Sequence, residues 1–175
     1  FKADRKLEDD EVSEIWSNFI FNESEIVNNN FELGFKQLTE IGVKAMSPGI
    51  NDPGTALDTL NYLAELAAMR MLKTDKTYLL DDDKNTLVKL EQLSFDSLMH
   101  HSYASFRTYC KHDFNLVHRL ISTLAELKNA PVQSQSYHET VDKQIGLVYG
   151  DALKSLKNDA DIEIITQLYN KVTND

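Results

Sequence analysis

The feature that most constrains the fold of this chain is a short turn at residues 45–56, which reads AMSPGINDPGTA. It holds two of the three prolines in the sequence. Pro48 disfavours helical geometry at Ser47, whereas Pro53 suits the first turn of a new helix capped by Asp52. One helix therefore ends, and another begins, within about half a dozen residues.

Apolar side chains recur at helical spacing on both sides of this turn. Residues 31–46 carry one apolar stripe and residues 53–72 a wider one, which predicts an antiparallel pair of helices. Gly34 and Gly42 lie inside the first helix, where each glycine costs about 1 kcal/mol relative to alanine. We therefore expect the second helix to approach closely there, with its alanines facing the glycines.

The rest of the chain is also predicted to be mainly helical. Residues 8–21 show helical periodicity, and Trp16 is expected to anchor this helix in the core. Capping residues mark the starts of the later helices, and the expected caps are one of Asn28–Asn30, Ser94, Asp113, a capping box at Ser136–Glu139, and Asn158–Asp159.

Residues 77–90 differ from the helical pattern, because two short apolar runs flank the polar residues 81–85. This arrangement suggests a small β-hairpin. The three aspartates at 81–83 lack the ligand spacing of a calcium loop, so a solvated turn is expected. The predicted fold is all-α, with about seven helices in one bundle-like domain over residues 1–175.

Composition narrows the classes of function. The net charge of −10 and the pI near 4.9 oppose binding to nucleic acid or to an anionic membrane surface. No segment approaches the roughly 18 to 20 apolar residues of a membrane helix, so the chain as given is expected to be soluble. Because it begins at Phe1 without an initiator Met or a signal peptide pattern, we expect a piece of a larger protein.

The residues typical of catalysis and metal binding form no recognisable constellation. Adjacent His100 and His101 would point about 100° apart on a helix, so they cannot share one ion. Asp96 and His100, four residues apart, could bind one ion together. Nothing in the sequence, however, brings a third ligand to them from His112, His118 or His138. The single Cys110 lies on a core-facing stripe and excludes a disulfide framework. We predict no metal, no cofactor and no catalytic residue.

The turn itself is the best remaining candidate for a site. Small polar side chains lie there near the free N–H groups of the next helix, which could bind an anion. Asp52 would occupy that place with its own carboxylate, so a self-satisfied structural turn is favoured over a ligand site. The candidate ligand-binding residues are Gln37, Glu40, Ser47, Asn51, Asp52 and Thr55.

Residues 30–60, reading NFELGFKQLTEIGVKAMSPGINDPGTALDTL, resemble the signature of a bacterial family of predicted membrane proteins, domain of unknown function 2254. The family pattern is similar to DxxxGxRQLxDIAxxALSPxxNDPxTA. Lys36 stands where the family has Arg, which weakens any bidentate role because lysine lacks the guanidinium fork. The matching residues are Gly34, Gln37, Leu38, Ile41, Ala45, Ser47, Pro48, Asn51, Asp52, Pro53, Thr55 and Ala56.

The resemblance implies a soluble C-terminal region of a longer, multi-pass protein of the bacterial inner membrane, on its cytoplasmic side. Our leading hypothesis is a non-enzymatic regulatory or assembly domain. Its expected partners are its own transmembrane region and further copies of itself in a homo-oligomer, without nucleic acid or direct membrane contact. The alternative is a small-ligand-binding or enzymatic domain with its site at the Ser47–Thr55 turn.

Overall fold

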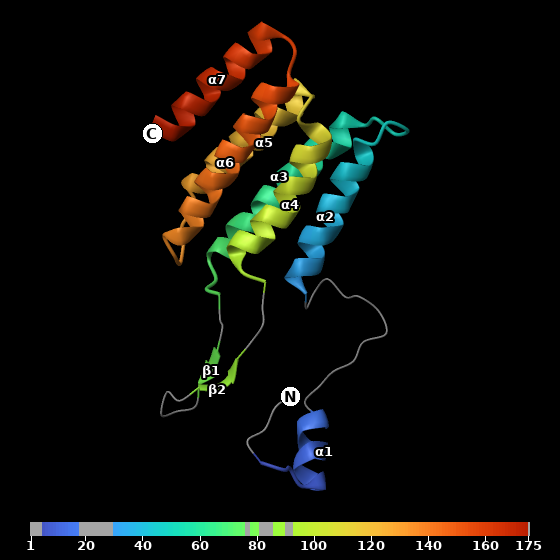
Figure 1. The fold of residues 1–175 in the computed structure, drawn as a ribbon, viewed down its shortest axis with the longest axis vertical. Helices are drawn as coiled ribbons and strands as arrows, with labels where there is room; N and C mark the ends of the chain where they lie inside the picture. The colour runs from blue at the N-terminus through green and yellow to red at the C-terminus, as the bar shows by residue number, and fades with distance from the viewer. Residues whose placement is uncertain (1–4, 18–29, 76–77, 81–85, 90–92, 175) are drawn as a thin grey trace.

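The computed structural model describes residues 5–17, 30–75, 78–80, 86–89 and 93–174 (Figure 1). Seven α-helices occupy most of these residues, so the all-α prediction is confirmed. The helices are α1 (Asp9–Ser17), α2 (Phe31–Ala45), α3 (Pro53–Met71), α4 (Phe95–Cys110), α5 (Phe114–Lys128), α6 (Ser136–Ser155) and α7 (Asp159–Asn174).

Two short strands lie between α3 and α4. β1 (Tyr78–Leu80) and β2 (Thr86–Lys89) pair in the antiparallel sense and form a two-stranded sheet. Residues 81–85, which include the three aspartates, lie outside the described residues. The hairpin over 77–90 as a whole therefore stays a prediction.

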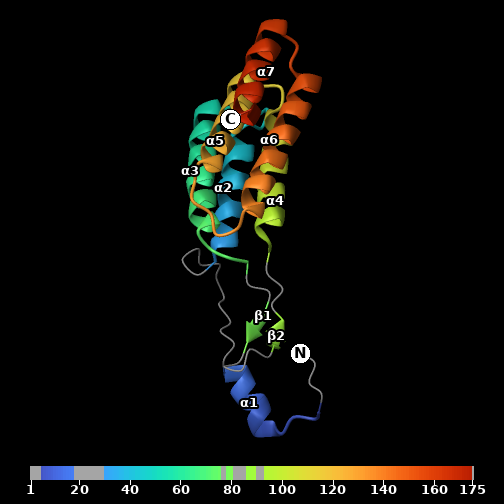
Figure 2. The same cartoon turned by 90° about the vertical axis from the view of Figure 1, so that its left-hand side faces the viewer.

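The bundle has four central helices and one helix on each flank. α3, α4, α5 and α6 pack around the core, α2 lies against α3 and α4, and α7 lies against α5 and α6 (Figures 1 and 2). From α2 to α6 each helix runs opposite to the one before it (Figure 1). Short connections favour this course in every pair except α3 and α4, between which residues 72–94 carry the two strands. The core includes the fully buried rings of Phe95, Tyr103 and Phe106 from α4.

The close approach expected at Gly42 is confirmed, but its nearest neighbours are Phe106 of α4 and Thr59 of α3 and not the expected alanines of α3. A Cβ atom on Gly42 would lie 2.4 Å from Cζ of Phe106 and 3.2 Å from Cγ2 of Thr59. The glycine therefore makes room for an aromatic ring of α4, not for the alanines of α3. Helical periodicity shows which face of a helix is apolar, but it does not show which helix covers that face.

Most of the predicted caps are confirmed. The side chains of Asn30, Asp52, Ser94 and Asp113 each accept a hydrogen bond from a backbone N–H at the start of their helix. The capping box at Ser136 is wrong, because Ser136 is already the first residue of α6. Its Oγ atom instead lies 2.8 Å from Oγ of Ser134.

The expected role of Trp16 is also wrong. Its side chain is 59% exposed, and none of the residues of α1 is buried. In both views α1 lies apart from the bundle (Figures 1 and 2). The predicted helix over 8–21 is helical as far as Ser17, and residues 18–29 lie outside the described part of the chain.

A polar clamp joins three helix ends at one end of the bundle. Arg70, near the end of α3, forms an ion pair with Asp75, whose carboxylate also accepts the N–H of Phe95 at 3.2 Å. The hydroxyl of Tyr137, in the first turn of α6, accepts the N–H of Asp75 and donates to the carbonyl of Lys73, each at 3.1 Å. The two ends of the segment that carries β1 and β2 are therefore tied to each other and to α6.

Candidate functional site

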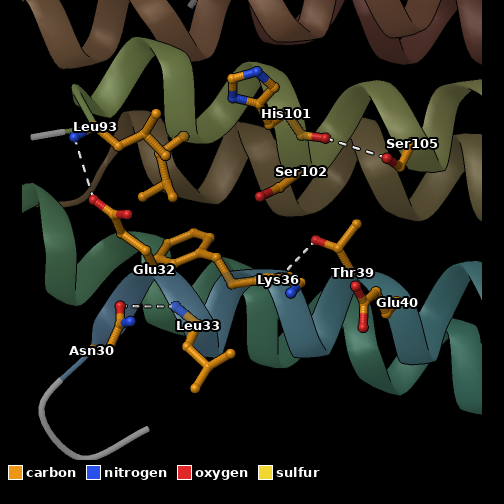
Figure 3. A pocket seen from close by; sticks show the side chains of 12 residues that line it. Asn30, Glu32, Leu33, Lys36, Thr39, Glu40, Leu93, His101, Ser102 and Ser105 are labelled. Atoms are coloured by element: carbon orange, nitrogen blue, oxygen red, sulfur yellow. Dashed lines mark hydrogen bonds between the residues drawn. The ribbon is translucent and has the colours of Figure 1, made fainter. Parts of the chain in front are cut away.

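A cavity of about 420 Å³ lies between α2 and α4 (Figure 3). Phe35 and Leu98 supply buried apolar side chains to its lining. Its polar lining residues are Asn30, Glu32, Lys36, Thr39, Glu40, His101, Ser102 and Ser105.

Helical spacing explains why these side chains lie together. Glu32, Lys36 and Glu40 are four residues apart, so they project from one side of α2. His101 and Ser102 come from the facing side of α4 (Figure 3). The charged ladder on α2 thus borders a cavity that the packing of α4 creates.

Several polar groups of this cavity are already used by the backbone. A carboxylate oxygen of Glu32 accepts the N–H of Leu93 at 3.3 Å. The hydroxyl of Thr39 donates to the carbonyl of Phe35 at 2.8 Å, and that of Ser105 donates to the carbonyl of His101 at 3.4 Å. These bonds hold the local structure and use the hydroxyl donors of Thr39 and Ser105.

The side chains of Lys36, Glu40, His101 and Ser102 are the cavity groups best placed to meet a ligand. Together they offer a cation, a carboxylate, an imidazole and a hydroxyl. In the described part of this cavity, no serine hydroxyl is hydrogen-bonded to a histidine ring or to a carboxylate that would act as its base. The arrangement can bind polar groups, but it lacks the geometry of an activated nucleophile.

Several polar groups of the predicted turn site take part in hydrogen bonds within the turn. The two carboxylate oxygens of Asp52 accept from Thr55, one from its N–H at 3.1 Å and one from its hydroxyl at 2.6 Å. These bonds, the hydroxyl first, hold the pKa of Asp52 below its usual value. The carbonyl of Ser47 accepts the N–H groups of Ile50 and Asn51, and Asn51 has a positive φ of 48°.

The six predicted site residues do not form one cluster. Glu40 lines the α2–α4 cavity, whereas Gln37 is exposed on α2. The other four belong to the turn at the far end of α2, where Asp52 and Thr55 bind each other. A ligand site at the turn stays a prediction. Sequence reasoning missed His101 and Ser102, because no local pattern shows that α4 packs against α2.

Three other candidate side chains from the sequence, those of Cys110, Asp96 and His138, lie outside this cavity. Burial, followed by the nearby charge of Asp113, raises the pKa of the Cys110 thiol to about 12, which keeps it protonated. Asp96 forms an ion pair with Lys143 at 3.4 Å. Nε2 of His138 lies 3.2 Å from the carbonyl of Ala130. Within the described ranges, no three His, Cys, Asp or Glu side chains are grouped to hold a metal ion.

Comparison with known proteins identifies a matching family. The family described as "Predicted membrane protein (DUF2254)" matches residues 1–126. Two similar relatives are "Uncharacterized protein Mb1321c" of Mycobacterium bovis and "Uncharacterized protein Rv1290c" of Mycobacterium tuberculosis. Each is 26% identical over 138 residues, which cover 77% of this chain and 26% of the relative.

The chain thus spans about a quarter of the length of the curated relatives that it matches. No solved structure matches it. Among the helices that the structure describes, none combines the length and the apolar character that a membrane crossing requires.

Proposed function

Because the chain belongs to DUF2254, a family of predicted membrane proteins, we propose that it is a non-enzymatic docking domain outside the bilayer in a longer, multi-pass protein. The greater length of the relatives supports this proposal, since it leaves room for a separate membrane region. The net charge of −10 also favours protein contacts over contact with anionic lipid.

The observation that carries the proposal is an apolar stripe on the outward face of α3. Tyr62, Leu66 and Met69 follow the i, i+4, i+7 spacing of one helix face, and we call them the α3 stripe. Tyr62 is 58% exposed and Met69 is 59% exposed. Tyr62 and Met69 are two of the eleven exposed large hydrophobic side chains in the described residues. Exposed apolar side chains on one face of a helix are typical of protein contact surfaces.

The charges beside the α3 stripe indicate its partner. Asp58 and Glu65 are exposed on the same side of α3, so a partner with apolar and basic side chains would complement this face. Cytoplasmic loops of multi-pass membrane proteins are rich in Lys and Arg. We therefore propose that the α3 stripe binds a basic cytoplasmic loop of the protein's own transmembrane region, with the domain on the cytoplasmic side of the bacterial inner membrane.

Site-specific photo-crosslinking in the full-length membrane protein tests this assignment. Met69→p-benzoylphenylalanine should crosslink to a peptide from a Lys- or Arg-bearing loop, which mass spectrometry identifies. The double variant Asp58→Lys/Glu65→Lys should lower the crosslink yield several-fold, because it opposes like charges.

The matched control is Tyr109→p-benzoylphenylalanine, since Tyr109 is 50% exposed on α4, away from the α3 stripe. Equal crosslinking of positions 69 and 109 to the membrane region would contradict the assignment. So would a yield at position 69 that ignores the charge reversal.

A further inference from the structure

Gly146 and Gly150 lie on the outward face of α6 and have no packing partner in the described part of the chain. A Cβ atom on either glycine would meet no other atom within 4 Å. A glycine inside a helix is destabilising relative to alanine. At Gly42 the ring of Phe106 uses the space that the missing side chain leaves, but nothing described does so at Gly146 or Gly150.

Ion pairs on both sides delimit this face of α6. Asp142 binds Lys128 of α5 at 3.2 Å, and Lys143 binds Asp96 of α4 at 3.4 Å. The two glycines and Leu153, which is 41% exposed, lie on the same face, further along α6 toward its C-terminus. α6 lies at the edge of the bundle in Figure 2, and a Cβ on Gly146 or Gly150 would face open space.

The charges along this face change sign at the glycines. The exposed Glu139 and Asp142 precede them, beside Lys143, which is paired with Asp96, and the exposed Lys154 follows them in the last turn of α6. A face of this kind is complementary to a second copy of itself in the antiparallel orientation. Placing Gly146 opposite Gly150 of a second copy brings Asp142 opposite Lys154.

We propose that two copies of this chain pair through α6, antiparallel and about a two-fold axis between Gly146 and Gly150. Because the interface is isologous, each pair of opposite charges occurs twice. The glycines allow the two helix backbones to approach closely, as small residues do at other helix contacts. A parallel pairing would place like charges together. The proposal rests on the proposed function and specifies the surface through which the assembly domain would associate.

The size of the contact predicts its strength. One helix from each copy buries less than the roughly 1,200 Å² of a standard stable interface, so the isolated domain associates weakly. Attachment to a membrane raises the effective concentration of the copies and strengthens the pairing without new contacts.

Sedimentation equilibrium of this chain, at concentrations up to about 1 mM, tests the proposal. We expect a monomer–dimer equilibrium that weakens at least tenfold in Gly150→Leu. Asp142→Lys should also weaken it at least tenfold, and Asp142→Lys/Lys154→Asp should restore it. Lys171→Asp, at an exposed position of α7, is the matched charge control and should leave the equilibrium unchanged. Circular dichroism and thermal unfolding identify any variant that fails to fold.

A chain that stays monomeric up to this concentration would overturn the proposal. Dimerisation that Gly150→Leu and Asp142→Lys leave unchanged in folded protein would overturn it as well, since another surface would then be responsible. Neither result affects the crosslink from position 69, which reports docking to the membrane region. Conversely, loss of that crosslink would leave the α6 dimer intact, so the two proposals fail separately.

Discussion

Tyr103 shows at the scale of one residue how much a buried polar atom matters. Its side chain is fully buried, and its hydroxyl has no hydrogen-bond partner among the described residues. Burial also raises the pKa of Tyr103 well above its usual value, so the hydroxyl is protonated. A buried hydroxyl without a partner loses its hydration and gains no bond in return.

Tyr103→Phe should therefore increase the free energy of unfolding by about 1 kcal/mol, because it removes the unpaired hydroxyl and keeps the ring. Urea unfolding followed by circular dichroism measures the change. Tyr137→Phe is the matched control and should destabilise the chain, since the hydroxyl of Tyr137 makes two hydrogen bonds in the polar clamp. A clear loss of stability in Tyr103→Phe would mean that its hydroxyl is bonded after all.

The stability of the chain should depend on pH through the carboxylate of Asp52. Its pKa is lowered by hydrogen bonds to Thr55, so its stabilising contribution is full above the unfolded pKa, near pH 4. The contribution is lost as the pH falls through the lower, folded pKa. Asp52→Ala should therefore lower the midpoint of thermal unfolding at pH 7, and the difference from the unsubstituted chain should shrink below about pH 4.

Asp52→Asn is the control for the charge, since asparagine can still accept the N–H of Thr55 as a helix cap. It should lower the thermal midpoint less than Asp52→Ala does at pH 7. A difference between Asp52→Ala and the unsubstituted chain that stays constant from pH 7 to pH 3 would show that the Asp52 carboxylate does not supply the stabilisation.

At the scale of elements, Gly42 in α2 and Gly146 in α6 show that two helices are packed differently. The space beside Gly42 in α2 is filled by Phe106, a ring with no exposed surface, whereas a Cβ on Gly146 in α6 would meet nothing within 4 Å. The same substitution should therefore have opposite effects on stability. Gly42→Ala should destabilise the chain by about 1 to 3 kcal/mol, because its Cβ overlaps the ring.

Gly146→Ala should stabilise the chain by up to about 1 kcal/mol, because alanine is the better helix former and has room there. Both values come from urea unfolding at a concentration low enough to keep the chain monomeric. Similar stabilisation by both substitutions would show that the ring of Phe106 shifts easily, and that helix propensity alone decides the outcome.

The whole molecule is a four-helix centre with α2 and α7 on its flanks. Much of this was predictable, because helix starts depend on interactions within a few residues. The cap at Asp52 and the antiparallel course of α2 and α3 follow from the proline-rich turn between them. The capping box predicted at Ser136 was wrong, because α6 begins one residue earlier than the pattern required. Gln135 is its N-cap, without a side-chain hydrogen bond.

The sequence by itself determined the helices, most of their caps and the acidic character of the surface, since these depend on nearby residues and on composition. Only the tertiary structure decided that Phe106 fills the space beside Gly42, that His101 and Ser102 meet the charged side of α2, and that Gly146 and Gly150 face outward. The physical reason is that periodicity specifies which face of a helix is apolar. The partner of that face depends on how side chains distant in the sequence fit together in the folded chain.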